Sequence, residues 1–491
     1  MLGTAAALFS RLDESRIRYC HWKSNWMLKE TVRGRTDIDI LVDRQDAPSL
    51  RTVLEKLRFR PAVEHGVPPF PSVEHFHALD GASGVLVHVH AYYRVITGGS
   101  LVKNYRLPVE EMLLEERRHL AGVAVPAAGA ELIVFVLRMA LKHTALPELL
   151  LLRRDWSDVR SEAAWLATDE AEAEAARLLR VWLPMIDVDL FATALDALRR
   201  PAPLWRRIVV GFRVRGALRP FARHGRARTW AATWRAFAVR ASHRASGTRK
   251  KLSPIAGGAI IAFVGSEATG KSTTIDEIDR WLSAHFNVRR VHVGKPPSTL
   301  LTALPNLLLP AFRALVPEQR LTRMEADRTP PRQEALAAGR FPLLFGARAV
   351  FLAHDRAALL ARALRRSANG TIILCDRYPS SDHGAPDGAQ LGDPSWLAPN
   401  ERLRRFLAGR EAALYRKIPL PDLVVHLTAP LEVTLARNRA RAKFEDEAYV
   451  RRRHGRSSAL RFDRARIHSI DTSGPAEESR REIREVIWDV L

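Results

Sequence analysis

The chain has 491 residues, of which 47% are apolar, so it is long enough for about three domains with buried cores. Lysine and arginine number 77 against 54 acidic residues, and the net charge of +23 favours polyanionic partners: nucleotides, nucleic acid or anionic lipid. No uncharged apolar run reaches the roughly 18 residues of a membrane helix, and no zinc-finger or aromatic-interleaved RNA motif accompanies the charge. A membrane span and a nucleic-acid partner are therefore not expected.

Cysteine usage indicates the cellular compartment. Cys20 and Cys375 are the two cysteines and lie far apart in the sequence, which fits a reducing environment without a disulfide framework. Residues 1–11 are apolar but lack the basic segment and small-residue cleavage site of a secretory signal. We therefore expect a cytoplasmic protein.

The first predicted region, residues 1–120, alternates strands and helices. Residues 38–42 are a short apolar run behind acids and residues 85–90 alternate with period two, so both are predicted strands. Asp37 and Asp39 lie at positions i and i+2, which face the same side of a strand. Two carboxylates placed in this way can bind one hard cation, as two-metal nucleotidyl transfer requires.

The segment that carries these acids, Gly34-Arg35-Thr36-Asp37-Ile38-Asp39-Ile40-Leu41-Val42, resembles the acidic motif of polymerase-β-type nucleotidyltransferases. The resemblance covers about residues 10–110 and implies a small α+β domain in which Asp37 and Asp39 bind metal. Lys23-Ser24 stands where that family has a Gly-Ser turn, and His88 stands where it has a third acid. A site without the third carboxylate can still bind a nucleotide without turning it over.

Two H-x-H pairs also fall on predicted strands, and each pair shares one strand face, which would suit a transition metal. The alternatives are core or surface histidines and, for the whole region, a folded domain without chemistry. The four residues are His75, His77, His88 and His90.

The second predicted region, residues 126–250, is mainly helical. Residues 131–143 carry apolar side chains at helical spacing, and residues 162–183 are rich in alanine, leucine, glutamate and arginine. Residues 205–251 contain almost no acids, and one predicted helix face there carries apolar side chains among arginines. Such a helix either packs on a neighbouring domain or lies on an anionic membrane. The apolar face consists of Trp230, Trp234, Phe237 and Ala241.

The third predicted region, residues 256–491, alternates strands and helices after a linker near Ser246-Gly247. This alternation predicts a parallel sheet with helices on both faces, so the chain as a whole is expected to be α/β. Residues 259–264 are predicted to form the first buried strand, and a Gly-rich turn and a helix follow.

The turn after this strand matches the phosphate-binding pattern G-x-x-x-x-G-K-[ST] at every fixed position. Gly265 and Gly270 permit backbone angles that point successive N–H groups at phosphate oxygens. The helix that begins near Lys271 directs its positive end at the same anion, and Ser272 is expected to hold Mg²⁺. The predicted ATP-binding residues are Gly265, Ser266, Glu267, Ala268, Thr269, Gly270, Lys271, Ser272 and Thr273.

Four further segments resemble thymidylate kinase and related nucleoside monophosphate kinases, and with the loop the resemblance covers about residues 258–491. It implies an ATP- and Mg²⁺-dependent kinase that acts on a small nucleotide, and a homodimer. The segments are the acid Glu267 in the loop, His354-Asp355-Arg356 on a predicted helix, Cys375-Asp376-Arg377-Tyr378 after an apolar strand, and residues 421–427 followed by Pro430, Glu432 and Arg437.

The resemblance assigns roles to these positions. Asp376 at a strand end can orient Mg²⁺ and its waters, and Arg377 can hold an acceptor phosphate by a bidentate fork. Arg356, Glu267 and Tyr378 belong to the acceptor site of that family. No arginine lies between Gly265 and Lys271, so catalytic positive charge is expected from a later lid, with Arg437 and Arg441 as candidates before residues 451–453.

One segment departs from the family pattern. The chain has Val293-Gly294-Lys295-Pro296-Pro297 where thymidylate kinases carry an Arg-Glu-Pro-Gly type segment. Lys295 is still a candidate for contact with a phosphate, but thymine selectivity is no longer specified. The insertion over residues 298–346 would also reshape the acceptor pocket. Thymidylate is the first candidate acceptor, and another small phosphorylated or hydroxylated acceptor stays open.

Three hypotheses follow for the whole chain. The first is a nucleoside monophosphate kinase. The second is a bifunctional enzyme whose first region transfers a nucleotidyl group to a small hydroxylated acceptor. The third is a non-catalytic ATP-binding scaffold that docks by its basic middle segment.

Overall fold

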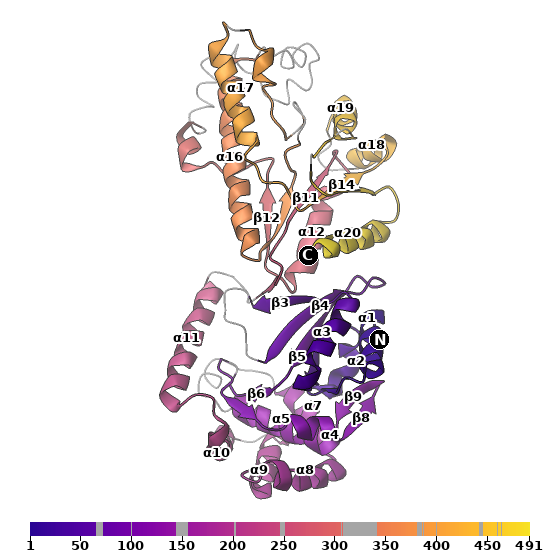
Figure 1. Cartoon of the computed structure of the whole chain (residues 1–491), viewed down its shortest axis with the longest axis vertical. Coiled ribbons are helices and arrows are strands. Elements are labelled where there is room, and N and C mark those ends of the chain that lie inside the picture. Colours follow the sequence, from indigo (N-terminus) through magenta and orange to yellow (C-terminus); the bar gives the residue numbers. More distant parts are fainter. Residues whose placement is uncertain are drawn as a thin grey trace. The chain divides into compact units, whose positions relative to one another are not determined.

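The computed structural model describes residues 1–64, 72–99, 101–143, 156–200, 203–245, 251–305, 307, 341–380, 385, 387–398, 400–440, 445–458, 460–462 and 464–491. The chain forms two compact units, Met1–Lys250 and Lys251–Leu491 (Figure 1). Each unit combines helices with a β-sheet, which confirms the prediction of a mixed α/β protein. None of the described helices has the length and apolar content that a bilayer crossing requires.

The sheet of the first unit has a parallel pair of strands at its centre. Its neighbouring strands follow the order β1-β2-β5-β4-β3, with β2 and β5 parallel and the other neighbours antiparallel. Both strands predicted from the sequence are confirmed. The elements in this part are α1 (Gly3–Glu14), β1 (Tyr19–His21), η1 (Asn25–Met27), α2 (Leu28–Thr31), β2 (Ile38–Val42), η2 (Arg44–Asp46), α3 (Ala47–Lys56), β3 (Arg60–Glu64), β4 (Val73–Leu79), β5 (Leu86–Tyr92), β6 (Val95–Thr97), β7 (Tyr105–Leu107), α4 (Glu110–Glu115), β8 (Arg117–Leu120) and β9 (Val123–Pro126).

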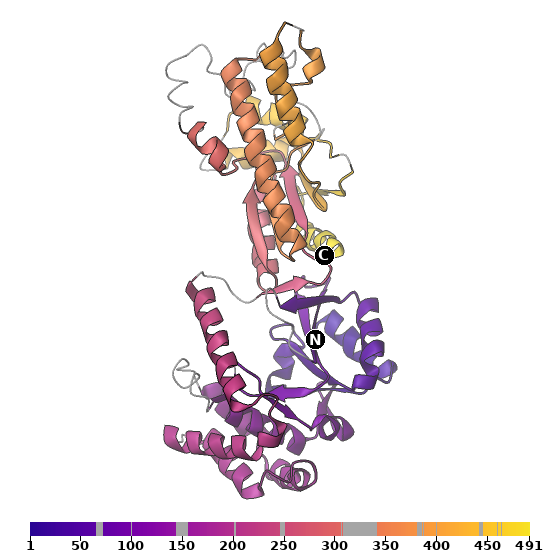
Figure 2. The same cartoon turned by 60° about the vertical axis from the view of Figure 1, so that its left-hand side comes forward.

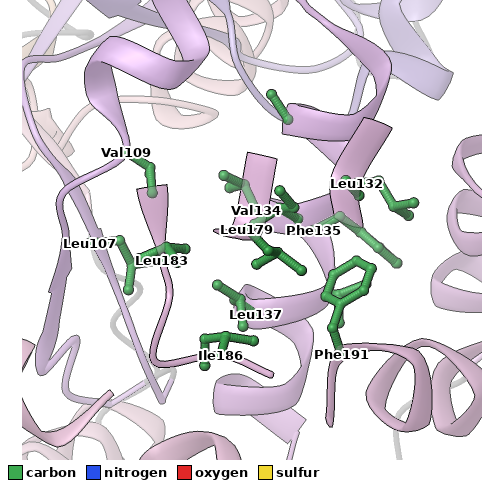
Figure 3. Packing of buried hydrophobic residues seen from close by; sticks show 14 of the residues in the cluster. Leu107, Val109, Leu132, Val134, Phe135, Leu137, Leu179, Leu183, Ile186 and Phe191 are labelled. Atoms are coloured by element: carbon green, nitrogen blue, oxygen red, sulfur yellow. The ribbon is translucent and has the colours of Figure 1, made fainter. Parts of the chain in front are cut away.

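The helical part of the first unit surrounds α5, whose residues 132–137 are all buried. A helix that is apolar around its whole circumference needs partners on all sides. Figure 3 shows Phe135 and Leu137 of α5 among side chains that include Leu179 and Phe191. The helices are α5 (Ala128–His143), α7 (Ser157–Leu166), α8 (Asp169–Trp182), α9 (Val188–Arg199), α10 (Leu204–Ala217), η3 (Arg219–Phe221) and α11 (Arg226–Ala245).

The same core includes residues from the predicted first region. Cys20, Leu41 and Tyr92 belong to one buried cluster with α5 and its neighbours. The boundary expected between residues 120 and 126 therefore does not separate two compact units, because the sheet and the helices bury their apolar faces against each other.

The sheet of the second unit is parallel throughout its described strands. Its neighbouring strands follow the order β12-β13-β11-β14-β15. The strands and helices predicted around the glycine-rich turn are confirmed. The elements are β10 (Leu252–Pro254), β11 (Ile260–Gly265), α12 (Lys271–Ser283), β12 (Val288–His292), α16 (Leu343–Ala368), β13 (Ile372–Asp376), η5 (Pro394–Trp396), α17 (Arg402–Tyr415), β14 (Leu423–Thr428), α18 (Leu431–Arg439), α19 (Glu447–Ser458), β15 (Ile467–Asp471) and α20 (Ala476–Val490).

Helices bury this sheet. Ile260 and Val264 of β11 share a core cluster with Leu360 of α16. Ile261 and Phe263 point to the opposite face, because side chains alternate along a strand, and both are fully buried. α16 and α17 lie side by side in both views (Figures 1 and 2). The carboxyl ends of the parallel strands therefore share one edge of a covered sheet, where α/β proteins place their ligands.

Candidate functional site

The glycine-rich turn joins the carboxyl end of β11 to the first residue of α12. Gly265 has φ of 146°, and a Cβ there would lie 2.3 Å from the carbonyl oxygen of Leu427 on β14. Gly270 caps α12 in the left-handed region, with φ of 89°. Glycine is thus required at Gly265 by close packing and favoured at Gly270 by its backbone angle. The predicted strand, turn and helix context of the phosphate-binding pattern is present.

The interior of the turn is organised around Ser266. Its carbonyl oxygen accepts hydrogen bonds from Thr269 Oγ1, at 3.0 Å, and from Lys271 Nζ. Lys271 is 9% exposed although it carries an ammonium group. The structure therefore places the motif lysine inside the turn. Ala268, Ser272 and Thr273 complete the predicted set, with Ala268 buried and the hydroxyl-bearing pair exposed on the first turn of α12.

Burial lowers the pKa of Lys271 to about 8, against the opposing effect of the Glu267 carboxylate. The folded protein therefore binds fewer protons at this group than the unfolded chain between pH 8 and 10.5, so its contribution to stability rises with pH across that window. Phosphate oxygens would favour the ammonium form and raise this pKa again.

We expect ATP binding near pH 8.5 to be accompanied by uptake of part of a proton at Lys271. With a pKa of about 8, Lys271 is deprotonated in more than half of the nucleotide-free molecules at that pH. Calorimetry in buffers of different ionisation enthalpy measures this uptake. Lys271→Arg is the matched control, since arginine stays charged and should show less uptake. Equal uptake in the two proteins would contradict the assignment of the proton to Lys271.

Glu267 lies at the centre of a cluster of cations. Its Oε1 atom is 3.2 Å from an Arg377 nitrogen and 3.6 Å from an Arg453 nitrogen. Burial acts against the charge of Glu267, but Lys271, Arg377 and Arg453 outweigh it and hold the pKa of the carboxyl below its usual value. The acid is therefore ionised and joins the turn, β13 and α19 in one electrostatic network.

Arg377 follows β13 in a strained backbone conformation, with φ of 71°. Non-glycine residues rarely adopt this region, and such strain often occurs at functional sites. The guanidinium lies 3.6 Å from Asp387 as well as near Glu267, and a Cβ on Gly294 would lie 2.9 Å from Arg377 Cδ. Three neighbours therefore fix the direction of this side chain.

Asp376 ends β13, and its register partners are Phe263 on β11 and His292 on β12. Asp376 Oδ2 lies 3.0 Å from His292 Nδ1. The carboxylate therefore stands at the same sheet edge as the glycine-rich turn. Its role in orienting Mg²⁺ stays a prediction.

Arg356 is buried in α16 and is fully engaged by protein groups. It donates hydrogen bonds to the Val293 carbonyl at 3.1 Å and to the Tyr415 hydroxyl at 2.7 Å. It also donates to the carbonyl and the carboxylate of Asp387, both at 3.1 Å. Tyr378 likewise donates its hydroxyl to the carbonyl of Pro419. These contacts hold loops of the unit together.

The remaining predicted residues are dispersed. Lys295 is exposed in the turn after β12. Arg437 of α18 donates to the hydroxyl of Thr472 at 3.2 Å and to its carbonyl at 2.6 Å, and the Thr472 hydroxyl donates to the carbonyl of Thr269. Arg437 is thus linked to the glycine-rich turn through Thr472. Arg441 lies outside the described residues.

Sequence reasoning did not single out Arg453, His292 or Asp387. Arg453 stands in a run of three arginines, and nothing in the run distinguishes the one whose side chain is 14% exposed and contacts Glu267. His292 precedes the segment that departs from the kinase pattern. Only its register beside Asp376 identifies it.

The acids predicted in the first unit do not form an open carboxylate pair. Asp39 Oδ1 lies 2.9 Å from Lys23 Nζ and 2.9 Å from His90 Nδ1. Burial acts in the opposite direction, yet Lys23 and His90 hold the pKa of Asp39 well below its usual range. Asp37 lies 2.9 Å from His88 Nδ1. Both acids therefore pair with side chains of this chain.

The basic amphipathic helix predicted near residue 230 is confirmed as α11. Trp230 and Trp234 are 68% and 55% exposed, and Trp205 of α10 is 67% exposed. Aromatic side chains beside arginines on a helix are typical of contact with anionic lipid surfaces. That contact stays a prediction.

Comparison with known proteins finds limited similarity. No family model matches the chain. The chain is similar to the "Uncharacterized ATP-binding protein YghR" of Escherichia coli strain K12, with 25% identity over 226 residues, 45% of this chain and 82% of the relative. The protein of the same name from Escherichia coli O6:H1 matches with the same identity and coverage.

Proposed function

We propose that the second unit binds ATP with Mg²⁺ and transfers its terminal phosphoryl group to a nucleoside monophosphate, with thymidylate as the first candidate acceptor. One observation carries the proposal. The phosphate-binding turn, with Lys271 inside it, lies at the sheet edge where Arg377 and Arg453 converge on Glu267. Phosphoryl transfer depends mainly on positioning and on neutralising charge between two anionic substrates, and this edge supplies both.

The donor groups fit a polyphosphate. The turn leads into the amino end of α12, and the unpaired N–H groups of a helix amino end favour an anion such as phosphate. Arg453 places a second guanidinium beside Glu267, with a nitrogen 3.6 Å from Glu267 Oε1, so two arginines stand near the turn. The relatives named ATP-binding proteins support ATP as the phosphoryl donor.

Asp376 and Ser272 fit a Mg²⁺ ion, which would neutralise charge on the transferred phosphates. Asp376 offers carboxylate oxygens at the sheet edge, and Ser272 offers a hydroxyl on the first turn of α12. Lys271 would exchange its bond to the Ser266 carbonyl for a phosphate oxygen.

Arg377 is the candidate for the acceptor phosphate. Its planar guanidinium can hold a phosphate by two parallel hydrogen bonds. Glu267 and Asp387 orient it from two directions, at 3.2 and 3.6 Å. Thymidylate as the acceptor rests on the motif resemblance, and so does the expected homodimer.

Purified protein with ATP, Mg²⁺ and a panel of nucleoside monophosphates tests the proposal. We expect ADP to form only when a monophosphate is present, fastest with thymidine monophosphate, because the acceptor phosphate engages Arg377. Thymidine is the matched control that lacks the phosphate. ADP formation at the same rate with thymidine, or no ADP despite ATP binding, would count against a monophosphate kinase. The second outcome would favour a non-catalytic ATP-binding protein.

The contacts of the first unit's acids do not support nucleotidyl transfer as a second function. Two-metal transfer needs carboxylates that can share a cation. Asp39 instead shares one oxygen between Lys23 and His90.

A further inference from the structure

The acidic pair and the second histidine pair of the first unit face each other across two parallel strands. Asp39 on β2 is the register partner of His90 on β5. His88 Nδ1 lies 2.9 Å from Asp37 Oδ1, and His90 Nδ1 lies 2.9 Å from Asp39 Oδ1. Each carboxylate therefore engages the Nδ1 atom of one imidazole, and this contact sets the direction of the ring and of its Nε2 atom.

A third imidazole completes the group from the neighbouring antiparallel strand. His75 on β4 is the register partner of His90, and its Nδ1 atom lies 3.3 Å from His88 Nε2. One ring nitrogen from each of His75, His88 and His90 lies within 4.8 Å of the other two. His77 stacks on the His88 ring, with centroids 4.0 Å apart, and further restricts that ring.

We propose that His75, His88 and His90 bind a divalent transition metal of the zinc class, with Asp37 and Asp39 as the carboxylates that position two of its ligands. Imidazole is a preferred ligand of Zn²⁺, and a metal-binding histidine almost always donates its second ring N–H to a carboxylate, a backbone carbonyl or water. The aspartates supply that arrangement twice, once for His88 and once for His90.

The spacing of the His75 and His88 nitrogens fits two ligands of one ion. Two nitrogens bound tetrahedrally at about 2.0–2.1 Å from Zn²⁺ lie about 3.3–3.4 Å apart. His75 Nδ1 and His88 Nε2 are separated by 3.3 Å. His90 Nε2 is 3.9 Å from Asp37 Oδ2, and the Asp37 side chain is 45% exposed, so solvent can reach this side of the group. The fourth coordination position would be open to water.

The same contacts argue against a hard cation at the two aspartates. Mg²⁺ requires oxygen ligands in near-octahedral geometry. Asp39 Oδ1 instead accepts from Lys23 Nζ at 2.9 Å, and this ammonium also donates to the Tyr92 hydroxyl at 2.9 Å. The Lys23 ammonium group therefore already supplies the positive charge next to Asp39. The three imidazoles are therefore the better ligand set.

The test uses the full chain without a histidine tag, stripped with a chelator and dialysed against Zn²⁺ or Co²⁺. We expect about one metal per chain by mass spectrometry, visible absorption from Co²⁺ in a nitrogen-rich tetrahedral site, and a higher Tm with Zn²⁺. His75→Ala should remove the stoichiometric metal and the Zn²⁺-dependent rise in Tm. His119→Ala, an exposed histidine on β8, is the matched control and should behave like the wild type.

Asp37→Asn provides a second measurement that does not remove a ligand. Loss of a positioning carboxylate should weaken Zn²⁺ binding roughly 10- to 100-fold, while the cooperative melt of the metal-free protein is retained. The proposal is overturned if the wild type binds Zn²⁺ no better than His75→Ala, or if the Co²⁺ spectrum is unchanged in that variant.

Discussion

Lys271→Ala is expected to lower ATP-dependent phosphoryl transfer by roughly 10²–10³-fold, the usual effect of removing one preorganised donor from a site of developing charge. Lys271 is buried in the glycine-rich turn, and its Nζ atom already bonds the carbonyl of Ser266. In the alanine variant a water molecule could occupy the position of the ammonium group, but it would not supply its positive charge to the phosphates. The loss should therefore appear in turnover and in nucleotide binding together.

The variant should fold as well as the wild type. Burial disfavours the charged form of Lys271, so alanine removes a desolvated charge. Glu267 keeps its contacts with Arg377 and Arg453, so no buried carboxylate is left unpaired. We expect the Tm without nucleotide to be equal or slightly higher.

Thermal melts with and without ATP·Mg, together with ADP formation, measure this prediction. Lys417→Ala is the matched control, because that lysine is exposed in the same unit and lies after α17. It should keep both the activity and the shift in Tm on adding ATP. A Lys271→Ala protein that ATP still protects fully would show that the turn does not hold the nucleotide.

The glycine-rich turn could be predicted because its determinants are local. Gly265, Gly270 and Lys271 lie within a few residues of each other, and the strand and helix that flank them have clear periodicity. The ion partners of Glu267 could not be predicted in the same way. Arg377 and Arg453 are 110 and 186 residues away in sequence, and only the packing of β13 and α19 brings them together.

The helical region shows a boundary that local chemistry could have predicted. The composition of residues 162–183 predicts helix, and in the structure two helices share this stretch: α7 ends at Leu166 and α8 begins at Asp169. The hydroxyl of Thr168 accepts a hydrogen bond from the Ala171 N–H at 3.2 Å, which is an N-cap. Acids in the first turn of α8 strengthen the signal.

Only part of the proposed metal site in the first unit could be predicted from the sequence. Alternation predicts that His88 and His90 share a face, as do Asp37 and Asp39. The pairing of the two sets depends on the register between β2 and β5, which lie about 50 residues apart along the chain. A shift of one residue would turn the imidazoles away from the acids.

Arg356→Ala is expected to destabilise the second unit by about 3–5 kcal/mol, the usual cost of leaving one member of a buried charged pair without its partner. The resemblance to thymidylate kinases implies that this arginine grips the acceptor. In the structure it is 3% exposed, and its nitrogens bond the Val293 carbonyl, the Tyr415 hydroxyl and both acceptor groups of Asp387. Removing it would release the loop around Asp387, which also contacts Arg377.

Chemical denaturation separates the two roles, with Arg362→Ala as the control because that arginine is exposed on the same helix. Arg362→Ala should leave the free energy of unfolding within about 0.5 kcal/mol of the wild type. If Arg356→Ala is as stable as the control but raises the KM for the acceptor with kcat unchanged, the arginine binds substrate and not the Asp387 loop. If instead Arg356→Ala lowers the free energy of unfolding and also raises the KM for the acceptor, Arg356 acts on the acceptor indirectly, by holding Asp387 and through it Arg377.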